Sequence, residues 1–433
     1  MLDPKWVREH PDDVIEAGRK KHMPCEEALE GFLAADRELR ALLPEVEGLR
    51  SEQKNAAKTI GRASAAEREA LLERQKEIKA RIQDLGRREK ELKERREACL
   101  LRLPNPPAQD VPEGVDDRDN VEIRRVGEPR VFDFEPKDHV RICEDLDLAD
   151  FPRAAEIAGT RNYFLKGDLV LLEEAVLRFA LDHMCAKGFR PLTVPLLVRD
   201  FAMVGTAYFP GGEEQAYRCE KDSLNLIGTG EVPVTAFHAG EILDRGNLPI
   251  RYVTRSVCFR REAGTYGKDT KGFYRVHQFQ KVEQVIVDIG DPDRSLAHHE
   301  SITRNSEELL QALELPYRVV NVCGGDLGQP QVQKFDIETW MPSREGYGET
   351  HSASRFHDFQ ARRLRLRYRG EDGKPRFCHT LNNTVVASPR ILIALLENHQ
   401  QEDGSVRVPE ALRPYFGKDR LGLPPSRGSA SGG

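Results

Sequence analysis

The chain has 433 residues, of which 39% are hydrophobic, and a formal net charge of −6 at pH 7. That length favours two domains over one, and the negative charge excludes a uniformly basic protein, so any nucleic-acid binding depends on a local basic patch. The eight scattered cysteines form no Cys-x-x-Cys pair, which predicts reduced thiols and no zinc. The N-terminus is charged and no apolar run approaches the roughly 20 residues of a membrane span. We therefore expect a cytoplasmic protein with no signal peptide and no membrane contact.

Residues 26–102 have the composition of a long helical hairpin. They are rich in Glu, Lys, Arg, Ala and Leu, and residues recur at alternating steps of three and four as imperfect heptads, with polar residues at several seam positions. The pattern breaks at residues 61–64, a short turn, and two helices joined by so short a turn must run antiparallel. The sequence predicts an antiparallel two-helix coiled-coil arm within an N-terminal domain of residues 1–103.

The hairpin pattern alone leaves the function of the arm open, since a dimerisation coiled coil or a solvated spacer has the same periodicity. Residues 50–62 carry four cations and one anion, and residues 71–100 carry ten Lys or Arg and seven Asp or Glu, an excess of three positive charges in each segment. Such a bias favours contact with nucleic-acid phosphates, without reading of sequence. The candidate tRNA-binding residues are Arg50, Lys54, Lys58 and Arg62.

The hairpin ends in a proline-rich segment, Leu103-Pro104-Asn105-Pro106-Pro107. Prolines stop the helix and stiffen the chain after it, so residues 104–135 are predicted to form a linker. From residue 136 to 420, short helical patterns alternate with β-rich runs at 250–259, 282–289, 317–322 and 364–368, which indicates an α+β catalytic domain. The Ser- and Gly-rich tail, 421–433, is expected to be disordered.

A polar loop between two β-rich runs is the strongest local signal. Phe259-Arg260-Arg261-Glu262 precedes a Gly-rich stretch, and Val276-His277-Gln278-Phe279 comes after it. Fixed cations beside such a loop can bind an anionic ligand, although an ordinary solvated hairpin has the same pattern.

Two further segments carry polar groups beside a predicted helix start. The first is residues 379–384 (HTLNNT), followed by Ser388-Pro389-Arg390 and an apolar helix; Arg390 at the start of that helix would favour an anion. The second is Thr229-Gly230-Glu231, where a hydroxyl beside a carboxylate could bind a small hydroxy-amine, although by itself the pattern favours a helix N-cap with an acidic first turn. Alternating arginines at 363, 365, 367 and 369 predict one face of a strand, most simply a solvated face.

Taken together, these segments resemble the class II aminoacyl-tRNA synthetases and, in detail, the bacterial-type seryl-tRNA synthetases. The resemblance extends from residue 1 to about residue 417. It depends on the N-terminal helical arm and on residues 226–235 (LIGTGEVPVT), 258–279 (CFRREAGTYGKDTKGFYRVHQF), 358–363 (DFQARR), 379–384 (HTLNNT) and 395–400 (LLENHQ). It implies an antiparallel sheet flanked by helices, and a homodimer with an interface near Pro195.

The resemblance also implies a reaction: serine is activated with ATP to seryl-adenylate and is transferred to the 3′ end of tRNA(Ser), and of tRNA(Sec) as well. Arg260 and Arg390 would be the catalytic residues. The implied serine-binding residues are Thr229, Gly230, Glu231, Arg260, Glu283, Asn382 and Thr384. The implied ATP-binding residues are Arg260, Arg261, Glu262, Phe279, Glu349, Thr350, His351, Ser352 and Arg390. Glu349 and Ser352 would hold Mg²⁺.

This sequence departs from the family pattern at four of these positions. Thr384 and His351 stand where serine is common, Pro389 where glycine is common, and Gly230 where alanine is frequent. The alternative is a synthetase homologue that loads an amino acid onto a carrier protein or a metabolite. Such relatives commonly lack the helical arm, whereas this chain has it.

Overall fold

The computed structural model describes residues 1–60, 64–264 and 271–422. The chain divides into two compact units, Met1–Pro106 and Pro107–Gly433. Among the described residues, no helix is long and apolar enough to cross a bilayer.

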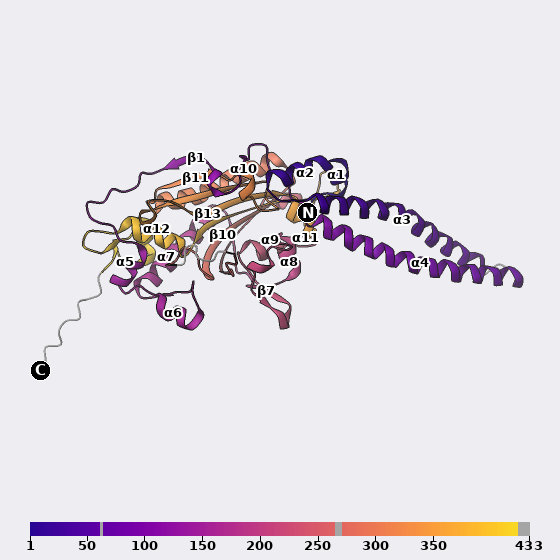
Figure 1. The fold of residues 1–433 in the computed structure, drawn as a ribbon, viewed down its shortest axis with the longest axis horizontal. Helices are drawn as coiled ribbons and strands as arrows, with labels where there is room; N and C mark the ends of the chain where they lie inside the picture. Colours follow the sequence, from indigo (N-terminus) through magenta and orange to yellow (C-terminus); the bar gives the residue numbers. More distant parts are fainter. Residues whose placement is uncertain (61–63, 265–270, 423–433) are drawn as a thin grey trace. The chain divides into compact units, whose positions relative to one another are not determined.

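The described part of the first unit is helical. Its helices are α1 Pro4–Glu9, α2 Pro11–Lys20, α3 Glu26–Ile60 and α4 Ala65–Leu100. The long helices α3 and α4 lie side by side as an antiparallel pair (Figure 1). Their facing sides bury residues at helical spacing, namely Leu29, Phe32, Leu39 and Val46 on α3 and Ile78, Leu85 and Leu92 on α4. The predicted coiled-coil arm is therefore confirmed.

A buried carboxylate lies within this helical unit. Asp36 of α3 is 1% exposed, and it accepts hydrogen bonds from Arg8 of α1 at 3.1 Å and from Arg96 of α4 at 3.2 Å. Because a buried charge is stable only when it is paired, this position links three helices of the unit.

The second unit is built on an eight-stranded sheet with the order β1-β11-β12-β13-β16-β10-β9-β4. Neighbouring strands are antiparallel except for β4 and β9, which are parallel. The strands are β1 Val121–Val126, β4 Arg190–Leu192, β9 Ile250–Phe259, β10 Gln278–Asp288, β11 Tyr317–Asn321, β12 Gln333–Met341, β13 Gly346–His357 and β16 His379–Ala387.

The first strand of this sheet lies inside the segment that we expected to be a linker. β1 pairs with β11, and Arg124 of β1 donates two hydrogen bonds to the Glu307 carboxylate at 2.8 and 2.7 Å. Residues 107–135 therefore belong to the second unit. The prediction missed this because β1 is a six-residue edge strand whose Val121 and Ile123 remain 48% and 42% exposed.

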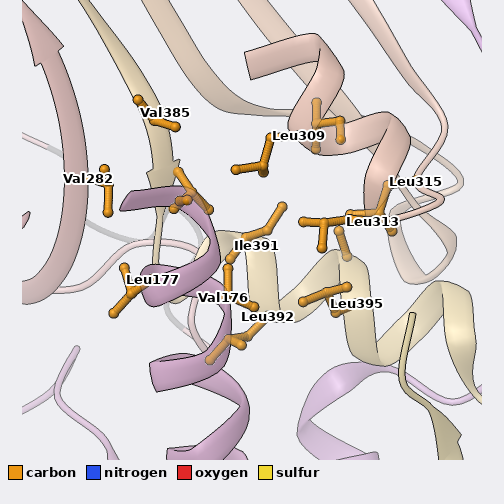
Figure 2. Packing of buried hydrophobic residues seen from close by; sticks show 14 of the residues in the cluster. Val176, Leu177, Val282, Leu309, Leu313, Leu315, Val385, Ile391, Leu392 and Leu395 are labelled. Atoms are coloured by element: carbon orange, nitrogen blue, oxygen red, sulfur yellow. The ribbon is translucent and has the colours of Figure 1, made fainter. Parts of the chain in front are cut away.

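Helices cover the sheet and close the main core. They are α5 His139–Asp145, α6 Phe151–Ala158, α7 Asp168–Ala186, α8 Asp200–Gly205, α9 Glu231–Ala236, α10 Pro292–Ala312, α11 Phe359–Leu364, α12 Arg390–His399 and α13 Arg413–Phe416. Figure 2 shows Leu177 of α7, Leu309 of α10 and Ile391 of α12 packed with Val282 of β10 and Val385 of β16. This apolar packing holds the sheet and helix α12 together.

Short strands complete the unit. They are β2 Ala149–Asp150, β3 Phe164–Leu165, β5 Leu197–Arg199, β6 Arg218–Cys219, β7 Leu224–Leu226, β8 Ile242–Leu243, β14 Arg367–Arg369, β15 Pro375–Phe377, β17 Val406–Arg407 and β18 Arg420–Leu421.

The prediction of a single strand through residues 363–369 is wrong. Arg363 lies in α11, which ends at Leu364, and Arg365 caps the helix with a left-handed backbone (φ +53°) before β14 begins. The Arg363 side chain is not solvated either, because it donates hydrogen bonds to the carbonyls of Val204 and Phe209 at 3.0 and 2.9 Å.

Candidate active site

A cavity of about 370 Å³ lies in the second unit against strands β10, β13 and β16. Successive residues of a strand face opposite sides, so alternate residues share the cavity face. On β10 these are Phe279, Lys281 and Glu283, and on β16 they are Asn382 and Thr384. Further lining comes from β13, from Arg260 directly after β9, and from the segments 206–208, 273–276, 328–331 and 388–390.

Arg260 comes directly after β9 and lines this cavity. Its Nε donates to the carbonyl of Gly228 at 3.2 Å, and its guanidinium lies 5.2 Å from the centre of the Phe279 ring. Within the described chain its two Nη atoms make no protein hydrogen bond, so they can donate to an anion in the cavity.

The next two residues diverge. Glu262 lines the cavity and accepts a hydrogen bond from Arg275 at 2.9 Å. Arg261 does not line it, because its exposed side chain lies over the Tyr217 ring, 5.9 Å from the ring centre.

A second arginine enters the cavity from the start of α12. Arg390 donates through Nε to the carbonyl of Tyr274 at 3.0 Å and through Nη1 to the carbonyl of Glu349 at 2.8 Å, and it pairs with the Glu349 carboxylate at 3.3 Å. The guanidinium lies 4.5 Å from the Tyr274 ring centre. Arg390 is therefore fixed by a strand and by an aromatic ring.

Glu349 is the first of four consecutive β13 residues that line the cavity. Partial burial would raise the pKa of Glu349, but the charges of Arg390, Lys334 and Arg260 outweigh that effect and lower the pKa. The side chain is 48% exposed, so an ionised carboxylate remains accessible to a ligand.

The other three residues are Thr350, His351 and Ser352. The Thr350 hydroxyl lies 2.8 Å from Nδ1 of His351, and burial lowers the pKa of His351 to about 4. This imidazole is therefore neutral at physiological pH.

We define the carboxylate cluster as Thr229, Glu231, Lys281, Glu283 and Thr384. All five side chains line the cavity and are at most 9% exposed. Lys281 forms an ion pair with Glu283 and donates to the hydroxyl oxygens of Thr229 at 2.7 Å and of Thr384 at 3.3 Å. Two carboxylates and one ammonium are thus held together out of water.

Glu231 occupies the start of α9 and is fixed from α11. Gln360 donates to the Glu231 carboxylate at 2.7 Å and accepts from the Thr380 hydroxyl at 2.7 Å. Burial raises the pKa of Glu231 to about 7, the charge of Glu283 adds to the rise, and the Gln360 hydrogen bond and the charge of Lys281 oppose it.

Gly230 lies beside the cluster but does not line the cavity. A Cβ at this position would approach Cγ2 of Thr254 to 2.6 Å and Oγ of Ser256 to 3.1 Å. Glycine therefore permits close packing of α9 against β9 at this position.

The described residues contain no group of three or more His, Cys, Asp or Glu side chains placed to hold a metal. Glu349 and Ser352 nevertheless offer the oxygen donors that Mg²⁺ prefers, and Mg²⁺ commonly uses one or two protein ligands together with substrate phosphates. The donor set fits a nucleotide-bound Mg²⁺ and does not fit a dedicated protein site.

The structure brings most predicted site residues into this one cavity. They are Thr229, Glu231, Arg260, Glu262, Phe279, Glu283, Glu349, Thr350, His351, Ser352, Asn382, Thr384 and Arg390. Gly230 and Arg261 lie outside the lining. On the arm, Arg50 and Lys54 are exposed, and Arg50 lies 3.6 Å from the Glu89 carboxylate. Arg62 and the side chain of Lys58 lie outside the described residues.

The sequence prediction missed Lys281 and Gln360. Strand alternation could have identified Lys281, since it stands between Phe279 and Glu283 at a spacing of two residues. Gln360 gives no comparable signal, because its contact with Glu231 depends on how α11 packs on the sheet.

Known proteins share both parts of this chain. A family model for the seryl-tRNA synthetase N-terminal domain matches residues 1–107, and a model for the tRNA synthetase class II core domain (G, H, P, S and T) matches residues 217–399. The serine–tRNA ligase of Deinococcus radiodurans is 49% identical over 428 residues, covering 98% of this chain and 100% of that protein.

Solved structures agree. Seryl-tRNA synthetase from Pyrococcus horikoshii, complexed with ATP, superposes with a TM-score of 0.91 at 43% identity, covering 98% of this chain and all of that one. Prolyl-tRNA synthetase from Giardia lamblia shares the fold alone, with a TM-score of 0.56 at 14% identity over 64% of this chain and 55% of that one.

The largely antiparallel sheet, with Arg260 beside its strand–loop–strand and Arg390 at the start of the helix after β16, defines a class II aminoacyl-tRNA synthetase core. Together with the N-terminal helical hairpin and the near full-length identities, these features place the chain in the seryl-tRNA synthetase family. Its activity is that of an ATP-dependent serine–tRNA ligase, and the carrier-loading alternative is not favoured.

Proposed function

We propose that the carboxylate cluster binds serine, that Arg260, Phe279, Arg390 and Glu349 bind ATP, and that the two substrates meet at Arg260. One observation carries this assignment: a single cavity joins a buried acidic cluster to two fixed guanidinium groups. The charges of serine and ATP complement these groups. The ammonium of serine suits the acidic cluster, and the serine carboxylate and the ATP phosphates suit the guanidinium groups.

Serine fits the carboxylate cluster through its polar groups. Its ammonium would bind Glu231 or Glu283, and its hydroxyl would lie near Thr384 and Asn382. Its carboxylate would then point to Arg260, whose Nη atoms are available within the described chain. Adenine would stack on Phe279, with Glu262 accepting from its amino group.

The chemistry depends on that placement. A carboxylate oxygen of serine attacks the α-phosphorus of ATP, the bond from that phosphorus to the bridging oxygen breaks, and pyrophosphate leaves. The nucleophile is already ionised, so no general base is required. Arg260 offsets the repulsion between two anions, and catalysis is mainly positioning and charge stabilisation. A terminal ribose hydroxyl of the tRNA then attacks the carbonyl carbon of the adenylate and releases AMP.

We assign Glu349 and Ser352 to a nucleotide-bound Mg²⁺. The ion, when bound, would neutralise phosphate charge. Glu349 supports this assignment because its pKa is lowered and its carboxylate is accessible.

Separate substitutions in the two halves of the cavity test the assignment. We expect Thr384→Val to raise the KM for serine in ATP–pyrophosphate exchange and to leave the KM for ATP unchanged, and Arg390→Ala to do the reverse. Lys418→Ala is the control, because Lys418 pairs with Asp168 away from the cavity. If Thr384→Val raised both constants equally, serine would not be bound by the carboxylate cluster.

We further propose that the arm binds tRNA(Ser) through its basic bias. Lys54 is exposed on α3, and the first unit matches the seryl-tRNA synthetase N-terminal domain. Neutralising Lys54, Lys58 and Arg62 should weaken tRNA binding and lower its salt dependence by about one unit of slope per lost phosphate contact. An unchanged slope would mean that the phosphates contact other residues.

We also propose a homodimer. Exposed apolar side chains occur near Pro195 on neighbouring segments of the second unit: Leu197 at 43%, Phe201 at 57% and Phe237 at 57% exposure. Exposed apolar groups of this size favour burial against a second copy. The expected mass in sedimentation equilibrium is twice that of the chain, and Phe201→Asp with Phe237→Asp should halve it; a monomer in the unaltered protein would contradict the proposal.

A further inference from the structure

Lys281 is a buried cation that the proposed reaction does not use. Its side chain is 5% exposed, and Nζ lies beside three oxygen acceptors: the Thr229 hydroxyl, the Thr384 hydroxyl and the Glu283 carboxylate. An ammonium group has three N–H donors. All three are engaged by protein, so Lys281 has none left for a substrate.

These contacts fix the direction of two hydroxyl groups. The Thr384 hydroxyl accepts from Lys281 and donates to the Glu283 carboxylate at 3.5 Å. The Thr229 oxygen accepts from Lys281 at 2.7 Å and from the backbone N–H of Glu231 at 3.2 Å. Both lone pairs of Thr229 are therefore occupied, and its own proton is directed to an acceptor elsewhere, in a cavity that Thr229 lines.

Lys281 also sets the charge of the cluster. Glu231 and Glu283 carry two negative charges when ionised, and Lys281 leaves a net charge of minus one. One ammonium from an amino acid balances that charge. Without Lys281, two carboxylates that are 9% and 2% exposed would face one another with no internal cation in the cluster.

We propose that Lys281 is a positioning residue for the amino-acid substrate, which supplies the internal cation of the carboxylate cluster and presents Thr229 to the substrate as a hydrogen-bond donor. The inference rests on the proposed binding of serine at this cluster. It makes Lys281 responsible for amino-acid affinity although it does not touch the amino acid.

The groups around Glu231 predict how this role depends on pH. Glu283 and Lys281 face it from β10, Gln360 from α11, Asn382 from β16, and Tyr208 from the loop after α8. Burial raises the pKa of Glu231 to about 7, and the charge of Lys281 opposes that rise. A protonated Glu231 cannot neutralise the serine ammonium, so serine binding weakens as the pH falls through this pKa. Loss of Lys281 raises the pKa further and moves the weakening to higher pH.

The test uses the full-length enzyme and ATP–pyrophosphate exchange between pH 6 and 9. We expect Lys281→Met to move the acid limb of the serine KM profile up by about one pH unit, equivalent to a roughly tenfold higher serine KM below the limb, with the ATP KM unchanged. Arg255→Met is the matched control, because Arg255 lies on the adjacent strand β9 but pairs with Glu174 outside the cavity. Arg255→Met should leave the pH dependence of the serine KM unchanged.

The double variant Lys281→Met/Glu283→Gln restores the net charge of minus one. Its acid limb should return toward that of the unaltered enzyme, which a packing role for Lys281 would not produce. If Lys281→Met does not fold, the double variant tests the role of Lys281 instead, because removing both members of a buried ion pair is commonly tolerated. The pH at which its serine KM rises is then compared with the corresponding pH for Glu283→Gln. Equal values would show that Lys281 has no electrostatic role.

Two outcomes separate this inference from the assignment of the pocket. If Lys281→Met raises the KM for serine and for ATP alike and leaves the limb unmoved, Lys281 is structural and the inference is wrong. If Glu231→Gln and Glu283→Gln each leave the serine KM unchanged, the cluster does not bind serine and both proposals fail. A loss of serine affinity in Glu231→Gln with an unmoved limb in Lys281→Met overturns the inference alone.

Discussion

Arg260 and Arg261 are neighbours in sequence with different surroundings. Arg260 projects over Phe279 into the cavity, whereas Arg261 lies exposed over Tyr217. A strand end explains the difference, because consecutive residues leave β9 in different directions. The pair therefore provides a substitution and its control at adjacent positions with the same chemistry.

Arg260→Ala should leave the fold intact and reduce serine-dependent ATP–pyrophosphate exchange by a factor on the order of 10²–10³, the usual cost of one preorganised charge-stabilising contact. Arg261→Ala should keep most of the activity. Circular dichroism and thermal unfolding establish that both variants are folded. Normal exchange by a folded Arg260→Ala enzyme would remove Arg260 from the reaction.

Gly230 provides a second prediction at the scale of one residue. Alanine here would place Cβ 2.6 Å from Cγ2 of Thr254, a β-branched side chain in a strand that cannot move away cheaply. We expect Gly230→Ala to lower the free energy of unfolding by about 1–3 kcal/mol, the typical cost of overpacking. Thr254→Ser removes the methyl group and should restore most of that loss in the double variant, as measured by urea denaturation. Additive losses would show that this contact is not the cause.

Site residues that alternate on a strand can be predicted from the sequence, whereas site residues that are placed by tertiary packing cannot. The resemblance predicts Phe279 and Glu283, and the same alternation includes Lys281 between them. Gln360 contacts Glu231 across 129 positions of sequence, and no local pattern encodes that distance. Arg261 belongs to the predicted ATP-binding set yet lies outside the cavity lining, because a motif gives the order of residues and not the direction of each side chain.

At the scale of elements, the arm helices were predictable because their apolar spacing is regular over many turns. The edge strand β1 and the helix α11 were not, because each has only six residues and tertiary packing decides their conformation. The four alternating arginines fit a strand by pattern, yet the burial of Phe359, Ala361 and Leu364 favours a helix there.

The buried Asp36 carboxylate is expected to stabilise the helical unit through its two arginine partners. Asp36→Ala removes the partner of Arg8 and Arg96, and hydrogen bonds to charged groups contribute about 1.5–3 kcal/mol. We expect a loss of that order in the stability of the helical unit, measured by hydrogen exchange of α3 and α4 amides. Glu47→Ala, at an exposed position of the same helix, is the control. Equal exchange in the two variants would show that the Asp36 pairs contribute little.

At the scale of the whole molecule, the chain divides into two compact units after Pro106. Every residue that lines the cavity lies beyond this point. A chain that starts at Pro107 should therefore retain serine-dependent ATP–pyrophosphate exchange and lose most tRNA charging. Exchange and aminoacylation assays on the same preparation check this. Charging at the full-length rate would mean that the arm is a spacer or an oligomerisation element.

The position of β1 so soon after this division restricts how such a gene can be shortened during evolution. A deletion that ends before residue 107 leaves the sheet complete, whereas one that continues past residue 121 removes its edge strand and the Arg124–Glu307 pair. A break between the helical arm and β1 therefore removes the whole arm and leaves the sheet intact. On the proposal that the arm binds tRNA, such a descendant would retain amino-acid activation and would depend on another acceptor, so a new, tRNA-independent enzyme could arise from this family by a break at that boundary.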